Sequence, residues 1–322
     1  MKRKNNINAK VLTDIQHNEL SSLKALKLIN QAFHWSSLIY PQTGDTALHV
    51  AARLGYTSTI DHLLNEYIPC AVNVRNNDDK TPLHEAAQFN QLQSVLMLLT
   101  HGADVNALKR ADWTPLMLAC TKIQPGISLS IVKALVENGA NVNVQNKDGW
   151  TCTHIIAREG SKEIFEYLVN AGLIVNAKTK NQRTALHIAA LHGNIDILPS
   201  LIFKVDINSK DACGNTPFHE SILGQHIDIG DYLFMNGADI WIENHNGFNA
   251  LHLAASQDNS DVINYLINQL NFHVNTQSRN GWTAAHCAAR KRCYKVFMYL
   301  EENGADMSIK DNFDRTPRAY LT

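Results

Sequence analysis

Histidine is the residue of this chain best suited to acid–base or metal chemistry, and the 322 residues include 15 of them. No H-E-x-x-H motif or Cys/His cluster is present, so the sequence contains no recognisable zinc pattern. Seven histidines instead recur at one place in a repeated pattern: His49, His84, His154, His187, His219, His252 and His286. A residue that recurs in register predicts a hydrogen-bonding role in a scaffold. We therefore expect no metal site and no cofactor.

Cysteine and lysine supply the other candidate nucleophiles. The six cysteines form no C-x-x-C pair, which indicates reduced thiols in a cytosolic protein. Cys287 and Cys293 flank a basic run, Arg290 to Arg292, whose charge could lower a thiol pKa; the alternative is that both cysteines only pack between helices. No glycine-rich phosphate loop or G-x-S-x-G motif occurs. We expect that the chain is not an enzyme.

A pattern of Thr-x-x-His followed by small apolar residues repeats along the chain. We call its first residues the anchors, and they lie 32 to 37 residues apart: Thr46, Thr81, Thr114, Thr151, Thr184, Thr216, Asn249, Thr283 and Thr316. Thr and Asn are favoured N-cap residues, because the side-chain oxygen accepts a hydrogen bond from a free backbone N–H. Proline follows four of the anchors, where it suits the first turn of a helix. Each anchor therefore predicts a helix start.

Every repeat is predicted to contain two helices. Paired small residues such as Ala86 and Ala87 allow close helix packing, a turn follows, and a second segment has apolar residues at helical spacing. Gly-Ala-Asp/Asn stretches and Asp-Gly or Asn-Gly turns then lead to the next anchor, and we call these projecting loops fingers. Pro199 falls inside the expected second helix of the fifth repeat, where it should kink the helix at a cost of about 3 kcal/mol.

The stretch from Thr81 to Ala87, Thr-Pro-Leu-His-Glu-Ala-Ala, resembles the signature of the ankyrin repeat family. This resemblance implies an all-α ankyrin repeat solenoid with short β-hairpin fingers and one continuous interior. The expected organisation is a polar tail over 1–17, a capping helix over 18–40, eight repeats over 41–315 and a truncated ninth repeat over 316–322. Such repeats usually bind other proteins, and two polar caps favour a monomer.

The residue before each anchor should lie at the base of a finger, within reach of a partner. We call this set the finger-base row: Asp45, Lys80, Trp113, Trp150, Arg183, Asn215, Phe248, Trp282 and Arg315. Aromatic residues and arginine are enriched in interface hot spots. Partner-binding candidates are therefore Lys80, Trp113, Trp150, Arg183, Phe248, Trp282 and Arg315. The alternative is that the aromatic rings only pack on neighbouring fingers.

Residues 109–117 and 146–150 also resemble the corresponding stretches of one branch of the family. That resemblance implies a partner, alanyl-tRNA synthetase, whose mischarging of serine is limited when lysines of the repeat protein accept the activated serine. Lys147 and Lys178 would be acceptors by motif position. Arg110 replaces a second lysine, so its neighbour Lys109 is a substitute candidate. Leu98 to Asn106 resembles an asparaginyl hydroxylation motif, which makes Asn106 a modification candidate.

Composition narrows the remaining possibilities. The chain has 29 Lys and Arg against 30 Asp and Glu, for a net charge of −1, which argues against a nucleic-acid partner. No apolar stretch approaches the length of a membrane helix. We expect a cytoplasmic protein, with nuclear entry left open by the basic residues at positions 2–4. A general scaffold or ubiquitin-ligase adaptor with an unrelated partner is the alternative function, although no recruiting box is visible before the chain ends.

Overall fold

The computed structural model describes residues 10–19, 38–66 and 72–321. These residues fall into two compact units, 1–174 and 175–322, and each unit is described by itself. We expected one interior running through all repeats. Each repeat packs mainly on its immediate neighbours. A repeat chain therefore has no single central hydrophobic core.

Each anchor is the N-cap of a helix that begins at the next residue, and each has extended backbone angles. Pro82, Pro115, Pro217 and Pro317 occupy the first helical position, as predicted. Several first helices end at a glycine in the left-handed conformation, as at Gly55 with φ 77°. The predicted starts are therefore confirmed.

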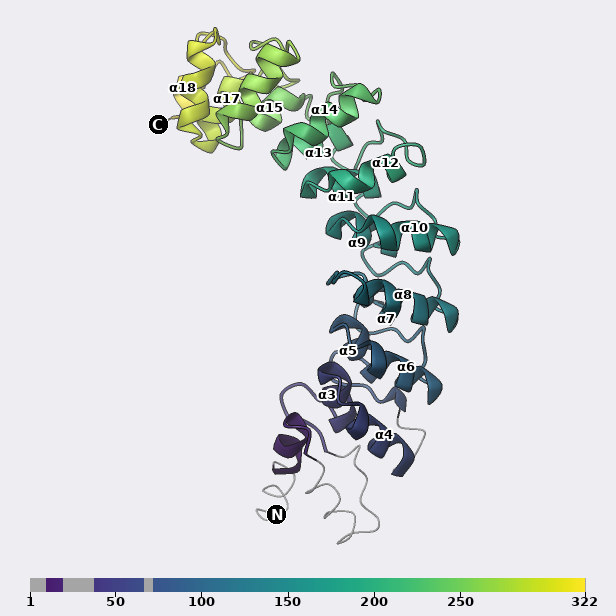
Figure 1. Cartoon of the computed structure of the whole chain (residues 1–322). Coiled ribbons are helices and arrows are strands. Elements are labelled where there is room, and N and C mark those ends of the chain that lie inside the picture. Colours follow the sequence, from purple (N-terminus) through teal and green to yellow (C-terminus); the bar gives the residue numbers. More distant parts are fainter. Residues whose placement is uncertain (1–9, 20–37, 67–71, 322) are drawn as a thin grey trace. The chain divides into compact units, whose positions relative to one another are not determined.

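In the described part of the first unit, α3 to α10 form four helix pairs, which can be followed in Figure 1. The first helices of its repeats are α3 (Ala47–Leu54), α5 (Pro82–Gln88), α7 (Pro115–Ala119) and α9 (Cys152–Glu159). The second helices are α4 (Thr57–Glu66), α6 (Leu92–Thr100), α8 (Ile127–Glu137) and α10 (Lys162–Asn170). Helix α3 packs on α5 and α5 on α7, while α4, α6 and α8 form a second row. Buried alanines such as Ala86 and Ala87 permit the close approach within the first row.

The second unit repeats this arrangement. Its first helices are α11 (Ala185–His192), α13 (Pro217–Leu223), α15 (Ala250–Ala254) and α17 (Ala284–Lys291). The second segments are η3 (Ile195–Ile197) with α12 (Leu198–Leu201), α14 (Ile227–Met235), α16 (Ser260–Asn264) with the π-helical η4 (Tyr265–Gln269), and α18 (Tyr294–Glu302). The short 3₁₀ helix η5 (Pro317–Tyr320) packs on α17.

Pro199 does not interrupt a helix, contrary to the sequence prediction. A 3₁₀ turn, η3, precedes it, and α12 begins only at Leu198. Proline then lies in the first turn of α12, where its missing N–H would have no intrahelical acceptor. The expected cost of a kink is avoided because the fifth repeat shortens its second helix.

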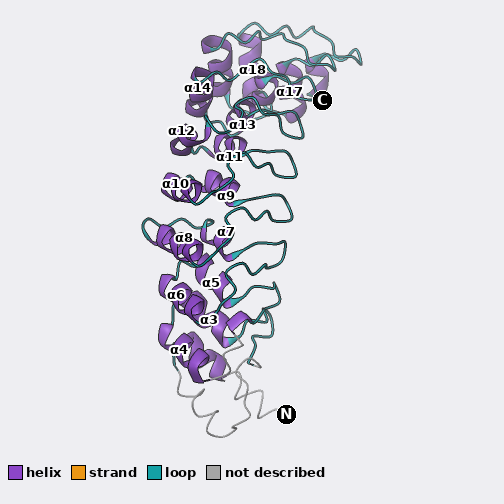
Figure 2. Cartoon of the chain, turned by 90° about the vertical axis from the view of Figure 1, so that its right-hand side faces the viewer, coloured by secondary structure: helices purple, strands orange, loops and turns teal. Residues whose placement is uncertain are grey.

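The fingers extend from one side of the helix pairs in each unit (Figure 2). A hydrogen bond closes each finger at its base, as from the backbone N–H of Lys109 to the carbonyl of Trp113 at 3.0 Å. Successive fingers are also joined, as from the N–H of Lys147 to the carbonyl of Ala111 at 3.0 Å. The expected β-hairpins are thus reduced to turns, and the described residues contain isolated bridges rather than strands.

The two ends of the chain differ from the expected caps. Residues 10–16, expected in a polar tail, form a helix with Val11 and Ile15 buried. The apolar stripe of the predicted capping helix, Leu20 to Phe33, lies outside the described residues. At the other end Thr316 begins the expected ninth repeat as the N-cap of η5.

Candidate functional site

The repeated histidines join consecutive repeats. The backbone N–H of Thr46 donates to Nδ1 of His49 (3.2 Å), and Nε2 of the same ring lies 2.8 Å from the carbonyl oxygen of Lys80. A backbone N–H can only donate, so Nδ1 must accept and Nε2 must carry the proton. Equivalent links run to the carbonyls of Trp113, Asn215, Trp282 and Arg315 from His84, His187, His252 and His286. The predicted scaffold role of these histidines is confirmed.

These rings are neutral at physiological pH. Burial lowers the pKa of His84, His187, His219 and His252 to about 4, from an ordinary value of 6.5. Burial also lowers the pKa of His49 and His286. A proton added at Nδ1 would face a backbone N–H, which makes the charged form still less favourable. The rings are therefore structural links and poor general acids near pH 7.

The same links position the finger-base row. Each linked carbonyl belongs to a residue of that row and also accepts the hydrogen bond that closes its finger. Two donors on one carbonyl restrict the backbone from which the side chain projects. These linked residues of the row are therefore preorganised, which reduces the entropy that binding would cost. The carbonyl of Trp150 accepts the finger-closing bond from Asn146, but Met117 stands in place of the linking histidine.

Ion pairs engage part of the row in the first unit. Nζ of Lys80 lies 2.8 Å from Oε1 of Gln88 and 3.0 Å from the buried carboxylate of Glu85. Trp113 has Nζ of Lys109 at 5.7 Å from its ring centroid, and Trp150 has the guanidinium of Arg158 at 5.6 Å. Lys80 is thus committed to intramolecular contacts, while each tryptophan is half-buried beneath a cation.

Arg183 and Arg315 are similarly engaged in the second unit. Arg183 contacts the buried carboxylates of Glu220 (2.9 Å) and Asp211 (3.5 Å). Burial raises the pKa of Glu220, although Arg183 and Asn215 favour its charged form. Arg315 contacts Asp311 at 3.0 Å. The sequence analysis identified Arg183 and Arg315 but not the acids that they contact. Asp311 precedes Arg315 in the same finger, whereas Asp211 and Glu220 lie in the repeat after Arg183.

The aromatic members of the row stack on one another in the second unit. Phe248 lies parallel to the ring of His252, with centroids 5.3 Å apart and an interplanar angle of 7°. Trp282 lies 6.2 Å from Phe248 and meets Tyr320 edge-on at 5.4 Å. The sequence analysis did not identify Tyr320 as a member of this stack. It lies four residues after the last anchor, on the helical face next to the row.

Comparison with known families agrees with this architecture. A family model described as "Ankyrin repeats (3 copies)" matches residues 15–109, 48–146, 116–211, 175–244 and 218–311. The chain belongs to the ankyrin repeat family. The predicted fold class, an ankyrin repeat solenoid, is confirmed.

Several curated ankyrin repeat proteins are similar to this chain. B-cell lymphoma 3 protein homolog of Mus musculus is 25% identical over 229 residues, which cover 70% of the chain and 44% of the mouse protein. Probable 26S proteasome regulatory subunit p28 of Saccharomyces cerevisiae is 30% identical over 123 residues, covering 37% of the chain and 52% of the yeast protein. Human ankyrin repeat and SOCS box protein 16 is 32% identical over 145 residues, covering 43% and 30%. The chain thus spans about half or less of the length of these relatives.

The three candidate lysines of this ankyrin protein differ in environment. Burial, together with the charges of Lys80 and Arg110, lowers the pKa of Lys109. Lys147 and Lys178 are exposed to solvent. A lowered pKa increases the neutral fraction of an amine, and only the neutral amine is nucleophilic. The surroundings of Lys109 therefore favour the neutral form of its amine.

Asn106 is tied to the following repeat. Its side-chain amide donates to the carbonyl of Gly139 (3.0 Å), and its Oδ1 accepts from the backbone N–H of Asn141 (2.8 Å). Asn143 makes the same pair of contacts one repeat later. The position is exposed but hydrogen-bonded, so a modifying enzyme would meet an ordered ankyrin finger.

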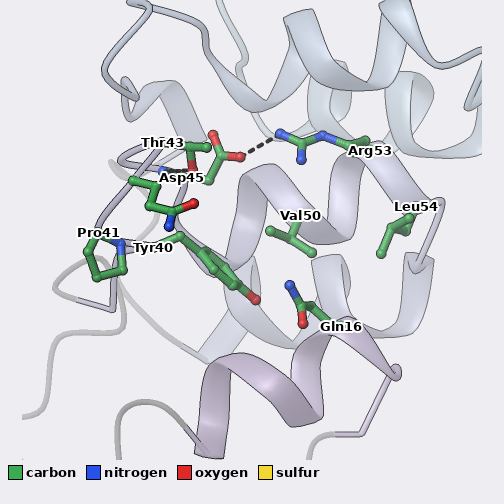
Figure 3. Close-up of a pocket in the computed structure, with 9 residues that line it drawn as sticks. Gln16, Tyr40, Pro41, Thr43, Asp45, Val50, Arg53 and Leu54 are labelled. Carbon is green, nitrogen blue, oxygen red and sulfur yellow. Dashed lines mark hydrogen bonds and ion pairs between the residues drawn. The ribbon is translucent and has the colours of Figure 1, made fainter. Parts of the chain in front are cut away.

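A pocket of about 550 Å³ lies beside the first repeat (Figure 3). Tyr40 lies at its centre, Gln16 at one edge, and Asp45 with Arg53 at the opposite edge. Arg53 contacts Asp45 at 2.5 Å and the carboxylate of Glu85 at 2.8 Å. Its cation is thus already neutralised. Sequence reasoning missed this pocket because Gln16 and Tyr40 precede the first anchor.

The reactive-thiol interpretation of Cys287 and Cys293 is wrong. Burial raises the pKa of Cys287 to about 12, and the nearby charge of Arg290 does not offset it. Burial likewise raises the pKa of Cys293. Both cysteines are structural because the apolar interior of the ankyrin stack disfavours a thiolate.

The described ranges also limit what this part of the chain can hold or span. No cluster of three or more His, Cys, Asp or Glu side chains that could hold a metal ion occurs in them. Within the same ranges, no helix has the length and apolar character needed to cross a membrane.

Proposed function

We propose that the finger-base row is the partner-binding surface of this ankyrin repeat protein. The repeats make the chain a protein–protein interaction module. The observation that supports this surface is the double hydrogen bonding of carbonyls within the row, those of Trp113 and Trp282 among them, which holds these two large aromatic side chains at a repeating edge. Trp113 and Trp150 are the strongest anchor candidates, because tryptophan dominates interface hot spots. Lys80, Arg183 and Arg315 are paired within the chain and act mainly by holding the edge in place.

Replacing Trp113 and Trp150 with alanine should abolish partner capture without unfolding the protein. Truncation of a hot-spot residue typically costs about 2 kcal/mol or more, so the double variant should bind about tenfold to a thousandfold more weakly. The measurement is affinity purification with the full chain as bait, followed by mass spectrometry of the captured proteins.

Trp241 provides the matched control. It is an exposed tryptophan outside the row, packed on Phe272 with ring centroids 4.6 Å apart. The Trp241→Ala variant should retain the partner. Equal capture by the wild type and by the Trp113/Trp150 double variant would assign binding to another surface.

The partner we propose is alanyl-tRNA synthetase. The support is the resemblance of residues 109–117 and 146–150 to ankyrin repeat domain-containing protein 16, a protein that contacts the catalytic domain of this synthetase. Both stretches include a tryptophan of the row, Trp113 and Trp150. The proposed binding surface and the resemblance therefore both involve the repeats that carry Trp113 and Trp150.

The proposed contribution to translation fidelity is acceptance of misactivated serine by lysine. A neutral lysine amine attacks the carbonyl carbon of seryl-adenylate, an amide bond forms, AMP leaves, and the amine loses a proton to solvent. Each acceptor is consumed, so the protein would not turn over as an enzyme. Lys109 is favoured by its lowered pKa, while Lys147 and Lys178 are favoured by motif position.

Intact mass spectrometry tests this acceptor function. Incubation with alanyl-tRNA synthetase, serine and ATP should add one or more seryl groups to the wild-type chain. Replacing Lys109, Lys147 and Lys178 with arginine should remove the addition, because the arginine side chain stays protonated. Lys310→Arg, at an exposed finger lysine, is the control that should still be acylated at the other sites. Absence of any seryl addition to the wild type would leave a binding module without acceptor chemistry.

A scaffold with an unrelated partner is the second candidate. Its support is the variety of the relatives, which are named as a B-cell lymphoma 3 protein homolog, a probable 26S proteasome regulatory subunit and an ankyrin repeat and SOCS box protein. The proposal also includes three further properties: the chain is monomeric, it is located in the cytoplasm or the nucleus, and Asn106 is hydroxylated.

A further inference from the structure

Three repeats carry an arginine seven residues after the anchor, and these arginines differ in their partners. Arg53 contacts Asp45 and Glu85, and Arg158 contacts Glu159 at 2.9 Å. Arg290 occupies the same position in the last full repeat. It is exposed and makes no ion pair with any acid among the described residues.

The repeat register explains why Arg290 lacks an acid. Asp45 precedes its anchor, and the corresponding residue beside Arg290 is Trp282. Glu159 follows Arg158, whereas Lys291 follows Arg290. The position of Glu85, four residues after the next anchor, is filled by Tyr320. None of the three positions that hold an acid beside Arg53 or Arg158 therefore holds one beside Arg290.

Arg290 borders a groove of about 380 Å³ in the second unit. Its guanidinium lies 4.8 Å from the ring centroid of Trp282. Stacking on a ring leaves the N–H edges of a guanidinium free to bind a carboxylate through two hydrogen bonds. Phe248, Leu253 and the ring of His252 supply apolar surface in the same groove.

The charge around this groove is positive. Lys291 and Arg292 are exposed, and neither forms an ion pair with a described acid. Arg292 also has φ 60°, at the helix end where three other repeats have a left-handed glycine. Asp258 lies near this end of α17, but its Oδ1 accepts from the backbone N–H of Val296 at 3.4 Å.

We propose that this groove binds an acidic segment of a partner protein. One carboxylate of the segment takes the place of the missing repeat acid at Arg290, and an adjacent apolar side chain packs against Phe248 and Trp282. This inference rests on the proposed function that the finger-base row binds proteins, and it names the chemistry of the partner. An acidic peptide fits better than a nucleic acid, because only three cations gather here on a chain of net charge −1.

The test is selection of random phage-displayed peptides on the full chain, followed by fluorescence anisotropy with an enriched peptide. The enriched peptides should carry an excess of Asp and Glu beside apolar residues. Arg290→Glu should weaken binding by about tenfold or more, because it replaces the attractive cation with a repulsive anion. Arg290→Lys should weaken binding less, since it keeps the charge but loses the bidentate geometry.

Lys295→Glu is the matched control, because it reverses one exposed charge on α18 outside the groove and should leave the affinity within about twofold. Enriched peptides without excess acid, no enrichment at all, or equal affinity for Arg290→Glu would overturn the inference. Tighter binding of a uridine oligoribonucleotide that is lost in Arg290→Glu would overturn it in favour of nucleic acid.

The two proposals can fail separately. If the purified partner is lost with the Trp113/Trp150 variant but retained by Arg290→Glu, the row remains the binding surface and the acidic segment is rejected. If Arg290→Glu loses the enriched peptide while the tryptophan variant captures every partner normally, the groove stands and the proposed anchors are rejected.

Discussion

Lowering the pH from 7 to 4 should unfold this protein, and the buried repeat histidines should be the main reason. In the folded state the pKa of His84, His187, His219 and His252 is about 4, whereas the unfolded chain has ordinary histidines near 6.5. Between these values the unfolded state binds more protons, so acid favours unfolding. The stability from these rings is complete above pH 6.5 and is lost as the pH falls through 4.

The expected effect is large because several rings act together. Each ring contributes about 3 kcal/mol over this range, a substantial fraction of the stability of a typical domain. Around pH 5 unfolding should take up close to four protons, which gives a slope of about 1.4 kcal/mol per pH unit for each proton. Urea unfolding followed by circular dichroism between pH 5 and 7 measures this slope directly.

Single variants can separate the links from general acid effects. His187→Gln should reduce the slope by about one proton while lowering stability at pH 7, because the link to the carbonyl of Asn215 is weakened. A slope that is flat in the wild type, or that His187→Gln leaves unchanged, would contradict the role of the buried rings.

Arg183→Ala should destabilise the protein by about 3 kcal/mol at pH 7. Glu220 is fully buried and loses its cation in this variant, and an unpaired buried charge is costly. The loss should shrink at pH 5, because burial already raises the pKa of Glu220 and a proton can then neutralise it. Thermal and urea unfolding at both pH values measure the difference.

The double variant Arg183→Ala with Glu220→Gln should recover part of the stability, since the buried group is then neutral. Lys310→Ala removes an exposed ion pair to Asp314 in the same unit and should cost less than about 1 kcal/mol. If Arg183→Ala behaves like Lys310→Ala, the pair with Glu220 contributes little, and Arg183 would again be free to serve a partner.

The repeat architecture could be predicted because its signals are local. An anchor such as Thr81, the proline after it and His84 three residues later lie within one helical turn, where N-cap geometry depends on neighbouring residues. The expected kink at Pro199 was wrong for a related reason. A short 3₁₀ turn before α12 moved the helix start to Leu198, and helix boundaries respond to packing more than helix existence does.

The amino-acid sequence by itself determined the repeat length, the helix starts and the register of the histidines, because each of these depends on contacts within a few residues. Only the stacking of repeats decided that Arg183 is committed, because it meets Glu220 across 37 residues, and that Glu85 is shared between Lys80 and Arg53 of the preceding repeat. Charge pairing across repeats depends on where side chains meet in space, and the spacing of residues along one repeat carries no record of it.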